Sequence, residues 1–156
     1  MSSLGRAFLR LALTAVCIAH GALKLFGLWG GPGAGPGGPH ATAAYFAAID
    51  LQPAQVLAVL AGLAQIVGGV LLALGWLTRY VAAAGLVYLG LGIWKAHWKW
   101  GFFLNWNLTP GYGHGYEYSL VLGGALLCLL LTGPGKLSID ARAVSRARQQ
   151  TAQKSG

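Results

Sequence analysis

The sequence predicts an all-α protein, an integral membrane four-helix bundle whose termini both lie in the cytoplasm. Of its 156 residues, 56% are hydrophobic and 9% are charged, and the mean hydropathy is +0.60. A soluble domain of this length cannot bury so much apolar surface. Four apolar segments also approach the length that a bilayer requires, about 20 residues each. These predicted spans run roughly over residues 7–28, 54–77, 80–98 and 116–133.

The positions of lysine and arginine predict the orientation of the spans. An even number of spans puts both termini on one side of the membrane. That side carries most of the basic residues, namely Arg6, Arg10, Arg79, Lys136, Arg142, Arg146, Arg148 and Lys154. The other side carries only Lys95 and Lys99, with Lys24 inside the first span. The positive-inside rule therefore places both termini in the cytoplasm, and we expect a multi-pass protein of a bacterial inner membrane.

A net charge of +8 is also compatible with nucleic-acid binding. Here, however, the charges lie at helix ends and in the tail rather than on one basic face. We therefore expect no nucleic-acid partner. The expected partners are the lipid bilayer and other protein subunits of a membrane complex.

The first span resembles a signal peptide at its start, because Arg6 and Arg10 precede the apolar run LALTAVCIA. A lipoprotein site at Cys17 is disfavoured, since Val16 is bulkier than the small residue expected there. The apolar character continues to Leu28, beyond the core of a signal peptide. We expect a retained membrane anchor.

The connections between spans differ in kind. Residues 30–39, GGPGAGPGGP, are expected to form a flexible linker. Residues 40–51 are compatible with a short surface helix whose Tyr45, Phe46 and Ile49 face lipid, although a plain connector is favoured. Thr78 and Arg79 alone join the second and third spans, which predicts a tight antiparallel hairpin.

The loop before the fourth span is rich in aromatic residues. They are Trp98, Trp100, Phe102, Phe103, Trp106, Tyr112, Tyr116 and Tyr118. Such density is typical of an interfacial belt, in which amphipathic rings lie at headgroup depth. The same rings are compatible with the entrance of a pocket for a flat amphiphile such as a quinone. The sequence leaves both interpretations open.

The fourth span ends at Gly133-Pro134-Gly135, which cannot continue a helix. Ser138 and Asp140 are suited to capping a new helix, which we expect from about Ile139 and lying against anionic lipid. Residues 1–141 are thus predicted to form one membrane domain, and residues 142–156 a basic cytoplasmic tail that is partly disordered.

Small residues recur on single helix faces and predict where the spans pack. These faces carry Ala58, Gly62, Gln65 and Gly69 in the second span, Gly85 and Gly92 in the third, and Glu117, Gly124 and Cys128 in the fourth. We expect the faces of the second and third spans to point inward, because small residues let membrane helices approach closely. Cys17 and Cys128 lie at different depths, so no disulfide is expected.

Polar residues inside the spans are the candidate site, because burying them in a bilayer is costly. His20 and Lys24 share one face of the first span, and Glu117 is predicted to pair with Lys24 or Lys95. The full candidate pocket is His20, Lys24, Gln65, Lys95, Tyr116 and Glu117. It is compatible with a small polar ligand, a quinone headgroup or a proton step. The plainer alternatives are lysines that snorkel to the interface and polar groups that hydrogen-bond across the bundle.

The chain lacks the parts of a self-sufficient enzyme. It has no nucleophile triad, phosphate loop or CxxC motif. Only His20 of the four histidines is embedded in a span, and no spaced ligand pair exists, so neither a metal nor a haem is expected.

Five motifs carry a resemblance to a known family. They are HGALKLFG from His20, GLAQIVGGVLLALGWLTR from Gly62, GFFLNWN from Gly101, GYEYSLVL from Gly115 and GPGKLSID from Gly133. In this order, from about Ala7 to Asp140, they resemble the DoxX/DoxD family of small four-helix membrane proteins. By that similarity His20, Lys24, Glu117 and Asp140 occupy motif positions.

The resemblance implies a membrane subunit of a quinone-linked redox complex, of the thiosulfate:quinone oxidoreductase type, or a partner in an oxidative-stress complex. Three positions depart from the family pattern. Gln65 and His114 stand where acidic residues are expected, and Ser119 where a histidine is expected. The missing mid-membrane carboxylate favours the alternative of a noncatalytic accessory subunit that anchors or stabilises a larger assembly.

Overall fold

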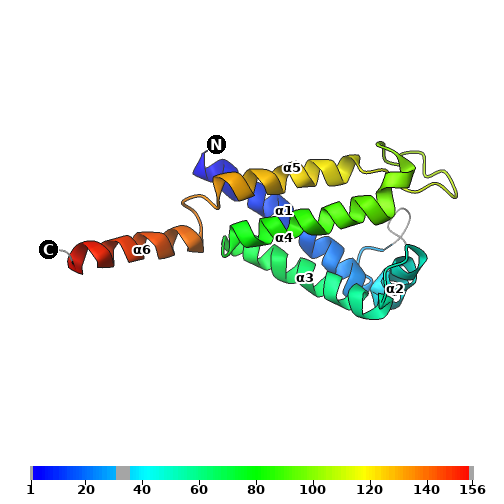
Figure 1. The fold of residues 1–156 in the computed structure, drawn as a ribbon, viewed down its shortest axis with the longest axis horizontal. Helices are drawn as coiled ribbons and strands as arrows, with labels where there is room; N and C mark the ends of the chain where they lie inside the picture. The colour runs from blue at the N-terminus through cyan, green and yellow to red at the C-terminus, as the bar shows by residue number, and fades with distance from the viewer. Residues whose placement is uncertain (1, 31–35, 155–156) are drawn as a thin grey trace.

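The computed structural model describes residues 2–30 and 36–154, and within them every regular element is helical (Figure 1). The α-helices are α1 (Ser3–Phe26), α2 (Gly38–Ala48), α3 (Ala54–Leu74), α4 (Thr78–Gly92), α5 (Glu117–Thr132) and α6 (Ile139–Lys154). A π-helical turn (Ile93–His97) and a 3₁₀ turn (Trp98–Trp100) extend α4. The all-α prediction is confirmed for this part of the chain. Most of the predicted 30–39 linker, residues 31–35, lies outside the described residues.

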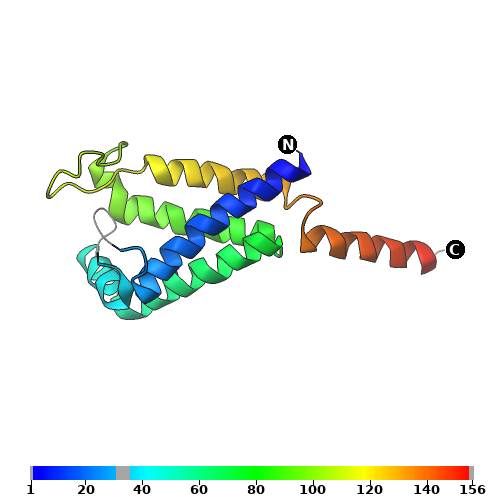
Figure 2. The ribbon, with the colours of Figure 1, turned by 180° about the vertical axis from the view of Figure 1, so that it is seen from behind.

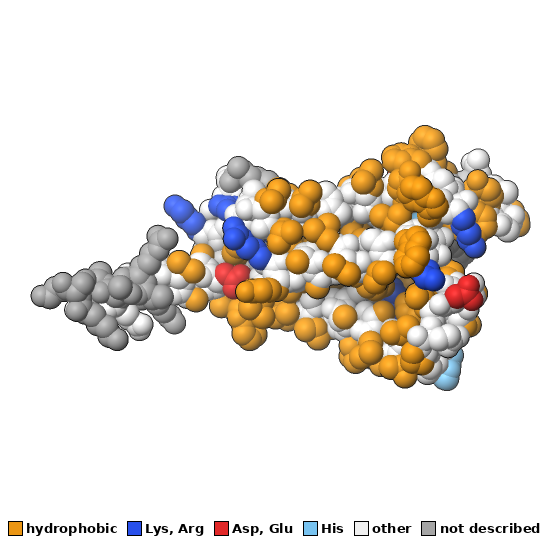
Figure 3. Space-filling view, in the orientation of Figure 1, with side chains coloured by type: hydrophobic (Ala, Val, Ile, Leu, Met, Phe, Trp, Pro, Cys, Tyr) orange, Lys and Arg blue, Asp and Glu red, His pale blue; other side chains and the backbone are white. Residues whose placement is uncertain are grey.

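Helices α1, α3, α4 and α5 lie side by side along the long axis of the molecule (Figures 1 and 2). The closest partners are α1 with α3 and α4 with α5, and α2 packs on α3 at the end opposite the N-terminus. By length and composition, α1 and α3 are capable of crossing a membrane, and α5 is a shorter apolar helix. Hydrophobic side chains cover most of one face of these helices, with Lys and Arg side chains toward its two ends (Figure 3).

Local sequence signals explain where α1 and α3 stop. The side chain of Ser2 accepts a hydrogen bond from the Gly5 amide at 3.0 Å and so caps the start of α1. Gly27 and Gly75 follow α1 and α3 with φ of 68° and 66°. This left-handed conformation costs little only for glycine, which is why both helices end there.

Glycines hold α1 and α3 close together. A Cβ atom at Gly21 of α1 would lie only 2.9 Å from the backbone oxygen of Gly62 of α3. A Cβ at Gly69 would meet Ile18 at 3.1 Å, and Thr14 donates a hydrogen bond to the Gly69 carbonyl at 3.0 Å. The inward face predicted for the second span is therefore present, and its backbone touches α1 directly.

The other predicted glycine faces hold only in part. A Cβ at Gly85 of α4 would lie 2.9 Å from Leu126 of α5, so this glycine is at the predicted interface. At Gly92 and Gly124 a Cβ would meet nothing within 4 Å. The prediction that Gly92 faces inward is wrong, because α4 meets α5 along Gly85. Gly124 of α5, for which no direction was predicted, also faces outward.

Two apolar clusters mark where the helices converge. One joins α1, α3, α4 and α5 through Leu13, Leu72, Ala82, Leu126 and Leu129. The other joins α2 to α3 through Ala43, Phe46 and Ala58. Residues 38–48 are thus a helix and not a plain connector, and Phe46 is buried against α3 instead of facing lipid.

Arginine side chains fasten the end of α5 to the start of the chain. Arg6 donates to the carbonyl of Thr132 at 2.8 Å, and Arg10 donates to the carbonyls of Pro134 at 3.1 Å and Leu137 at 2.5 Å. Arg10 is only 3% exposed. These carbonyls lie at the end of α5 and just beyond it, where no next helical turn satisfies them, so the guanidinium groups replace the missing donors.

Ser138 and Asp140 cap two different helices. The Ser138 hydroxyl accepts from the Ala141 amide at 3.1 Å and caps α6, as expected. The Asp140 carboxylate instead accepts from the amides of Leu77 and Thr78, at 2.9 and 3.1 Å, and so caps α4. From this anchor α6 extends away from the other helices along their long axis (Figures 1 and 2). The helix expected from about Ile139 is present, and its contact with anionic lipid stays a prediction.

Candidate functional site

The six predicted site residues are not gathered in one place. Lys95 lies in the π-helical turn with its ammonium 4.9 Å from the ring centroid of Trp94, which is largely exposed. Tyr116 stacks on Trp98 with ring centroids 5.6 Å apart and meets the edge of Phe102. Both belong to the aromatic loop rather than to the interior of the helices.

Glu117 begins α5, and its backbone amide donates to the Phe102 carbonyl at 2.9 Å. Within the described residues, 2–30 and 36–154, no ion pair joins the Glu117 carboxylate to Lys24 or Lys95. The predicted pairing is therefore absent. The physical reason for Lys95 is that the π-helical turn places its side chain over Trp94.

Of the other three predicted residues, Lys24 and Gln65 lie between α1 and α3, and His20 lies beside them. Lys24 is on the face of α1 that meets α3, where a Cβ at Gly62 would lie 3.3 Å from the Cβ of Lys24. Gln65 follows on the same side of α3, and its amide oxygen is buried without a hydrogen-bond partner among the described residues. His20 lies one turn before Lys24, close enough for their charges to interact, and its side chain is exposed.

Further polar residues lie near this group, and they were not predicted as site residues. Cys17 shares the face of His20 and Lys24 at spacings of three and seven residues. It is within electrostatic range of Lys24, and also of Tyr88 of α4 and Tyr118 of α5. We call Cys17, His20, Lys24, Gln65, Tyr88 and Tyr118 the interhelical cluster.

One sequence signal for Tyr88 existed. It is the single polar side chain between Val81 and Ile93, in an otherwise apolar run. A tyrosine at that depth is not part of an interfacial belt, so it needs a hydrogen-bond partner or a ligand. Tyr118 gave no comparable signal, because it follows the aromatic loop directly.

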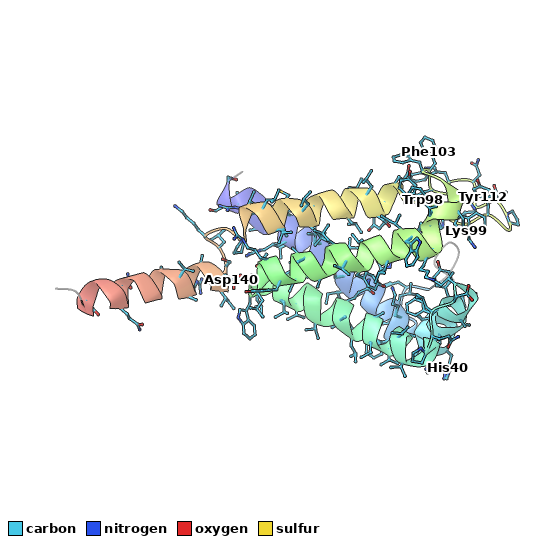
Figure 4. The ribbon with its side chains drawn as sticks, in the orientation of Figure 1. His40, Trp98, Lys99, Phe103, Tyr112 and Asp140 are labelled. Carbon is cyan, nitrogen blue, oxygen red and sulfur yellow. The ribbon has the colours of Figure 1, made fainter. Side chains whose placement is uncertain are left out.

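A second feature is a pocket of about 280 Å³ between α2 and the extension of α4, which we call the outer pocket. Its walls are Tyr45 and Ala48 of α2 with Ile49 just after it, Ala96, His97, Lys99 and Trp100 of the two turns, and Gly113 and His114 of the loop. Figure 4 labels Lys99 on the side of the loop toward α2. None of the six predicted site residues lines this pocket.

Asn105 organises the loop behind the outer pocket. Its side-chain nitrogen donates to the carbonyls of Thr109 and Tyr112, and its side-chain oxygen accepts from the Thr109 amide. Its backbone amide donates to Nδ1 of His114 at 3.2 Å. A Cβ at Gly113 would collide with the indole of Trp100, so only glycine lets the loop approach that ring.

The loop fixes opposite tautomers on the two pocket histidines when both are neutral. Nδ1 of His97 contacts the backbone oxygen of His114 at 2.8 Å, and a carbonyl only accepts, so Nδ1 must carry the proton. Nδ1 of His114 accepts from an amide, so its proton is on Nε2. His97 therefore offers an acceptor at Nε2, and His114 offers a donor.

Neither feature assembles the ligands of a metal. No group of three or more His, Cys, Asp or Glu side chains in the described ranges is close enough to hold an ion. The interhelical cluster instead offers an ammonium, an imidazole, an amide oxygen and two phenols. These groups suit hydrogen bonding to a polar headgroup that enters from between helices.

Comparison with known proteins gives one match. The family model of DoxX matches residues 5–98, which is more than half of the chain. The matched range contains His20, Lys24, Gln65 and Tyr88, whereas the loop, α5 and the GPGKLSID motif follow it. Neither the curated proteins nor the solved structures contain a significant match.

Proposed function

The chain belongs to the DoxX family, and from that premise we propose that it is the membrane subunit of a quinone-linked redox complex in a bacterial inner membrane. A complex of the thiosulfate:quinone oxidoreductase type is the first candidate, by the resemblance of the family. The chain supplies the membrane site, and another subunit supplies the electron donor.

In this proposal α1, α3, α4 with its extension, and α5 cross the bilayer, and both termini are cytoplasmic. The basic residues Arg6, Arg10 and Arg79 lie together at the end where α6 begins, which supports that end as the cytoplasmic one. The aromatic loop then lies at the outer interface, where its rings suit headgroup depth.

The observation that carries the quinone role is the buried amide oxygen of Gln65, which has no hydrogen-bond partner among the described residues. Leaving such an acceptor unsatisfied costs about 1–3 kcal/mol. A quinol hydroxyl would donate to it, and the ammonium of Lys24 would donate to a quinone carbonyl. When bound, the quinone supplies the two-electron chemistry, and the residues of this chain orient its headgroup.

The tyrosines extend the same argument to the rest of the interhelical cluster. Tyr88 and Tyr118 come from α4 and α5, and His20 from α1, so three helices supply polar groups around one region. Because His20 and the two tyrosines are exposed in the single chain, a headgroup has access from the lipid. Among the described residues, no hydrogen bond or ion pair joins the Glu117 carboxylate to this group, so Lys24 is the residue to test first.

The test is photo-crosslinking with an azido-quinone in lipid nanodiscs, followed by peptide mapping by mass spectrometry. We expect label on the peptides that carry Lys24 and Tyr88, with competition by unlabelled quinone. Lys24→Gln should reduce specific labelling by about tenfold, because it removes a charged donor. Lys95→Gln is the matched control and should leave it unchanged. Labelling confined to the aromatic loop, or equal in both variants, would reject this site.

One observation favours the alternative of a noncatalytic accessory subunit. Gly92 and Gly124 face open space on the outside of α4 and α5, where a helix of another subunit has room to approach closely. Gly124→Leu should then lower recovery of the assembly from membranes while this chain itself still accumulates. Unchanged recovery would count against the accessory role.

A further inference from the structure

The outer pocket combines one cationic side chain and several neutral polar groups with apolar walls. Lys99 contributes an ammonium 4.8 Å from the ring centroid of Trp100, and no Asp or Glu lines the pocket. Asp50 follows Ile49 in the sequence and is exposed, but it is not among the lining residues. The charge inside the pocket is therefore positive, which favours an anion.

Three of the hydrogen-bonding groups can donate to an oxygen acceptor, whereas neutral His97 presents an acceptor at Nε2. With its proton on Nε2, neutral His114 is a donor, and its orientation is fixed by the Asn105 amide. Partial burial raises the pKa of the Tyr45 hydroxyl, which therefore stays protonated and able to donate. Together with Lys99, these groups provide donors from α2, from the 3₁₀ turn and from the loop.

The remaining walls are apolar or aromatic. Ala48 at the end of α2, Ile49 just after it, Ala96 and Trp100 all line the pocket. Its volume, about 280 Å³, is at the lower end for ligand pockets, so it suits a small molecule with one apolar body. An inorganic anion would leave these walls without a partner.

We propose that the outer pocket binds a small organic carboxylate, with its carboxylate at Lys99 and His114 and its apolar body between Trp100 and Ile49. This site shares no lining residue with the interhelical cluster and does not depend on the redox role. The carboxylate has two possible sources, a water-soluble acid outside the cell and a fatty acid in the outer leaflet.

The test is calorimetric titration of the full chain in zwitterionic nanodiscs, with empty nanodiscs as the blank. Benzoate is the probe, benzyl alcohol is its uncharged analogue and sulfate is the anion without an apolar body. We expect benzoate to bind about tenfold more tightly than either, because only benzoate uses both the donors and the walls. Equal affinity for benzoate and benzyl alcohol, or for benzoate and sulfate, would overturn the proposal.

Lys99 and Lys95 each hold an ammonium over a tryptophan ring, at 4.8 and 4.9 Å from its centroid, so they provide matched variants. Lys99→Gln should weaken benzoate binding about tenfold, whereas Lys95→Gln should not, because Lys95 lies over Trp94 outside the pocket. Tyr45→Phe is a milder second variant that removes one hydroxyl and should weaken binding several-fold. Equal losses in the two lysine variants would reject the site.

Laurate then distinguishes the source. Tighter binding of laurate than of benzoate assigns the pocket to a membrane fatty acid, and the reverse assigns it to a water-soluble acid. Either result supports a carboxylate site provided that Lys99→Gln weakens it. Laurate binding that is insensitive to Lys99→Gln reports partition into lipid and rejects the site for fatty acids.

Discussion

Asp140, in the first turn of α6, caps α4 at Thr78, 62 residues earlier in the chain. Its two carboxylate oxygens accept from the consecutive amides of Leu77 and Thr78, and its own amide donates to the Gly75 carbonyl at 3.1 Å. Thr78 is completely buried. One residue thereby joins the α3–α4 hairpin to the segment that follows α5.

Loss of this cap should lower stability. Asp140→Ala removes both acceptors from the first amides of α4 and should cost about 1–2 kcal/mol, the range measured for caps. Because membrane proteins often unfold irreversibly, the measurement is the apparent Tm in detergent at a fixed scan rate. Asp50→Asn is the control, since Asn tolerates the left-handed conformation at that position (φ 57°) and should leave Tm unchanged. Equal Tm values for the two variants would contradict the capping role.

Arg10 should be the most sensitive of the basic residues. Arg10→Met leaves the carbonyls of Pro134 and Leu137 without their buried donor, so we expect a loss of about 2–4 kcal/mol. Arg10→Lys should recover only part of it, because one ammonium lacks the planar fork that reaches both carbonyls. Arg142→Met, at an exposed arginine, should change stability by less than about 0.5 kcal/mol. The thermal melts and expression levels of the three variants test this order of stability.

The contact between α1 and α3 depends on Gly21. Gly21→Ala places a methyl group 2.9 Å from a backbone oxygen that cannot move aside, so the helices must separate. Overpacking of this kind costs about 1–3 kcal/mol. Gly92→Ala, where the methyl group meets open space, should be neutral or stabilising by up to about 1 kcal/mol. If both substitutions lower Tm equally, close packing at Gly21 is not the cause.

The proposed topology predicts which residues a reagent reaches from outside the cell. In a chain with Cys17→Ala and Cys128→Ala, a cysteine in place of exposed Thr109 should react with a membrane-impermeant maleimide on intact cells. A cysteine in place of Ser145 on α6 should react only after the membrane is opened. Labelling of Ser145→Cys in intact cells would reverse the orientation.

The glycine faces show how far sequence patterns reach. Gly62 and Gly69 recur at helical spacing and do contact α1, as predicted. Gly92 and Gly124 follow the same kind of pattern and face outward. Periodicity identifies residues on a common face of one helix, but the direction of that face depends on where the neighbouring helices lie.

The candidate site was predictable only in part. His20, Lys24 and Gln65 stand out because polar groups in apolar runs are costly. A pocket entrance lined by the rings of the aromatic loop was left open by the sequence, but the residues that line the outer pocket were not predicted as a site. Its donors come from α2, from the 3₁₀ turn and from the loop. Tyr45 and His114 are 69 residues apart, and no local pattern relates them.

Composition and the spacing of apolar residues were sufficient to predict that this chain is helical and suited to a bilayer. Both properties can be read without knowing which distant residues come into contact. Asp140 is a residue whose role the sequence alone did not predict. Its sequence context predicts the cap of the helix in which it lies, and the structure gives its carboxylate to α4. Only tertiary structure decided this, since a carboxylate stabilises whichever unsatisfied amides packing brings within reach.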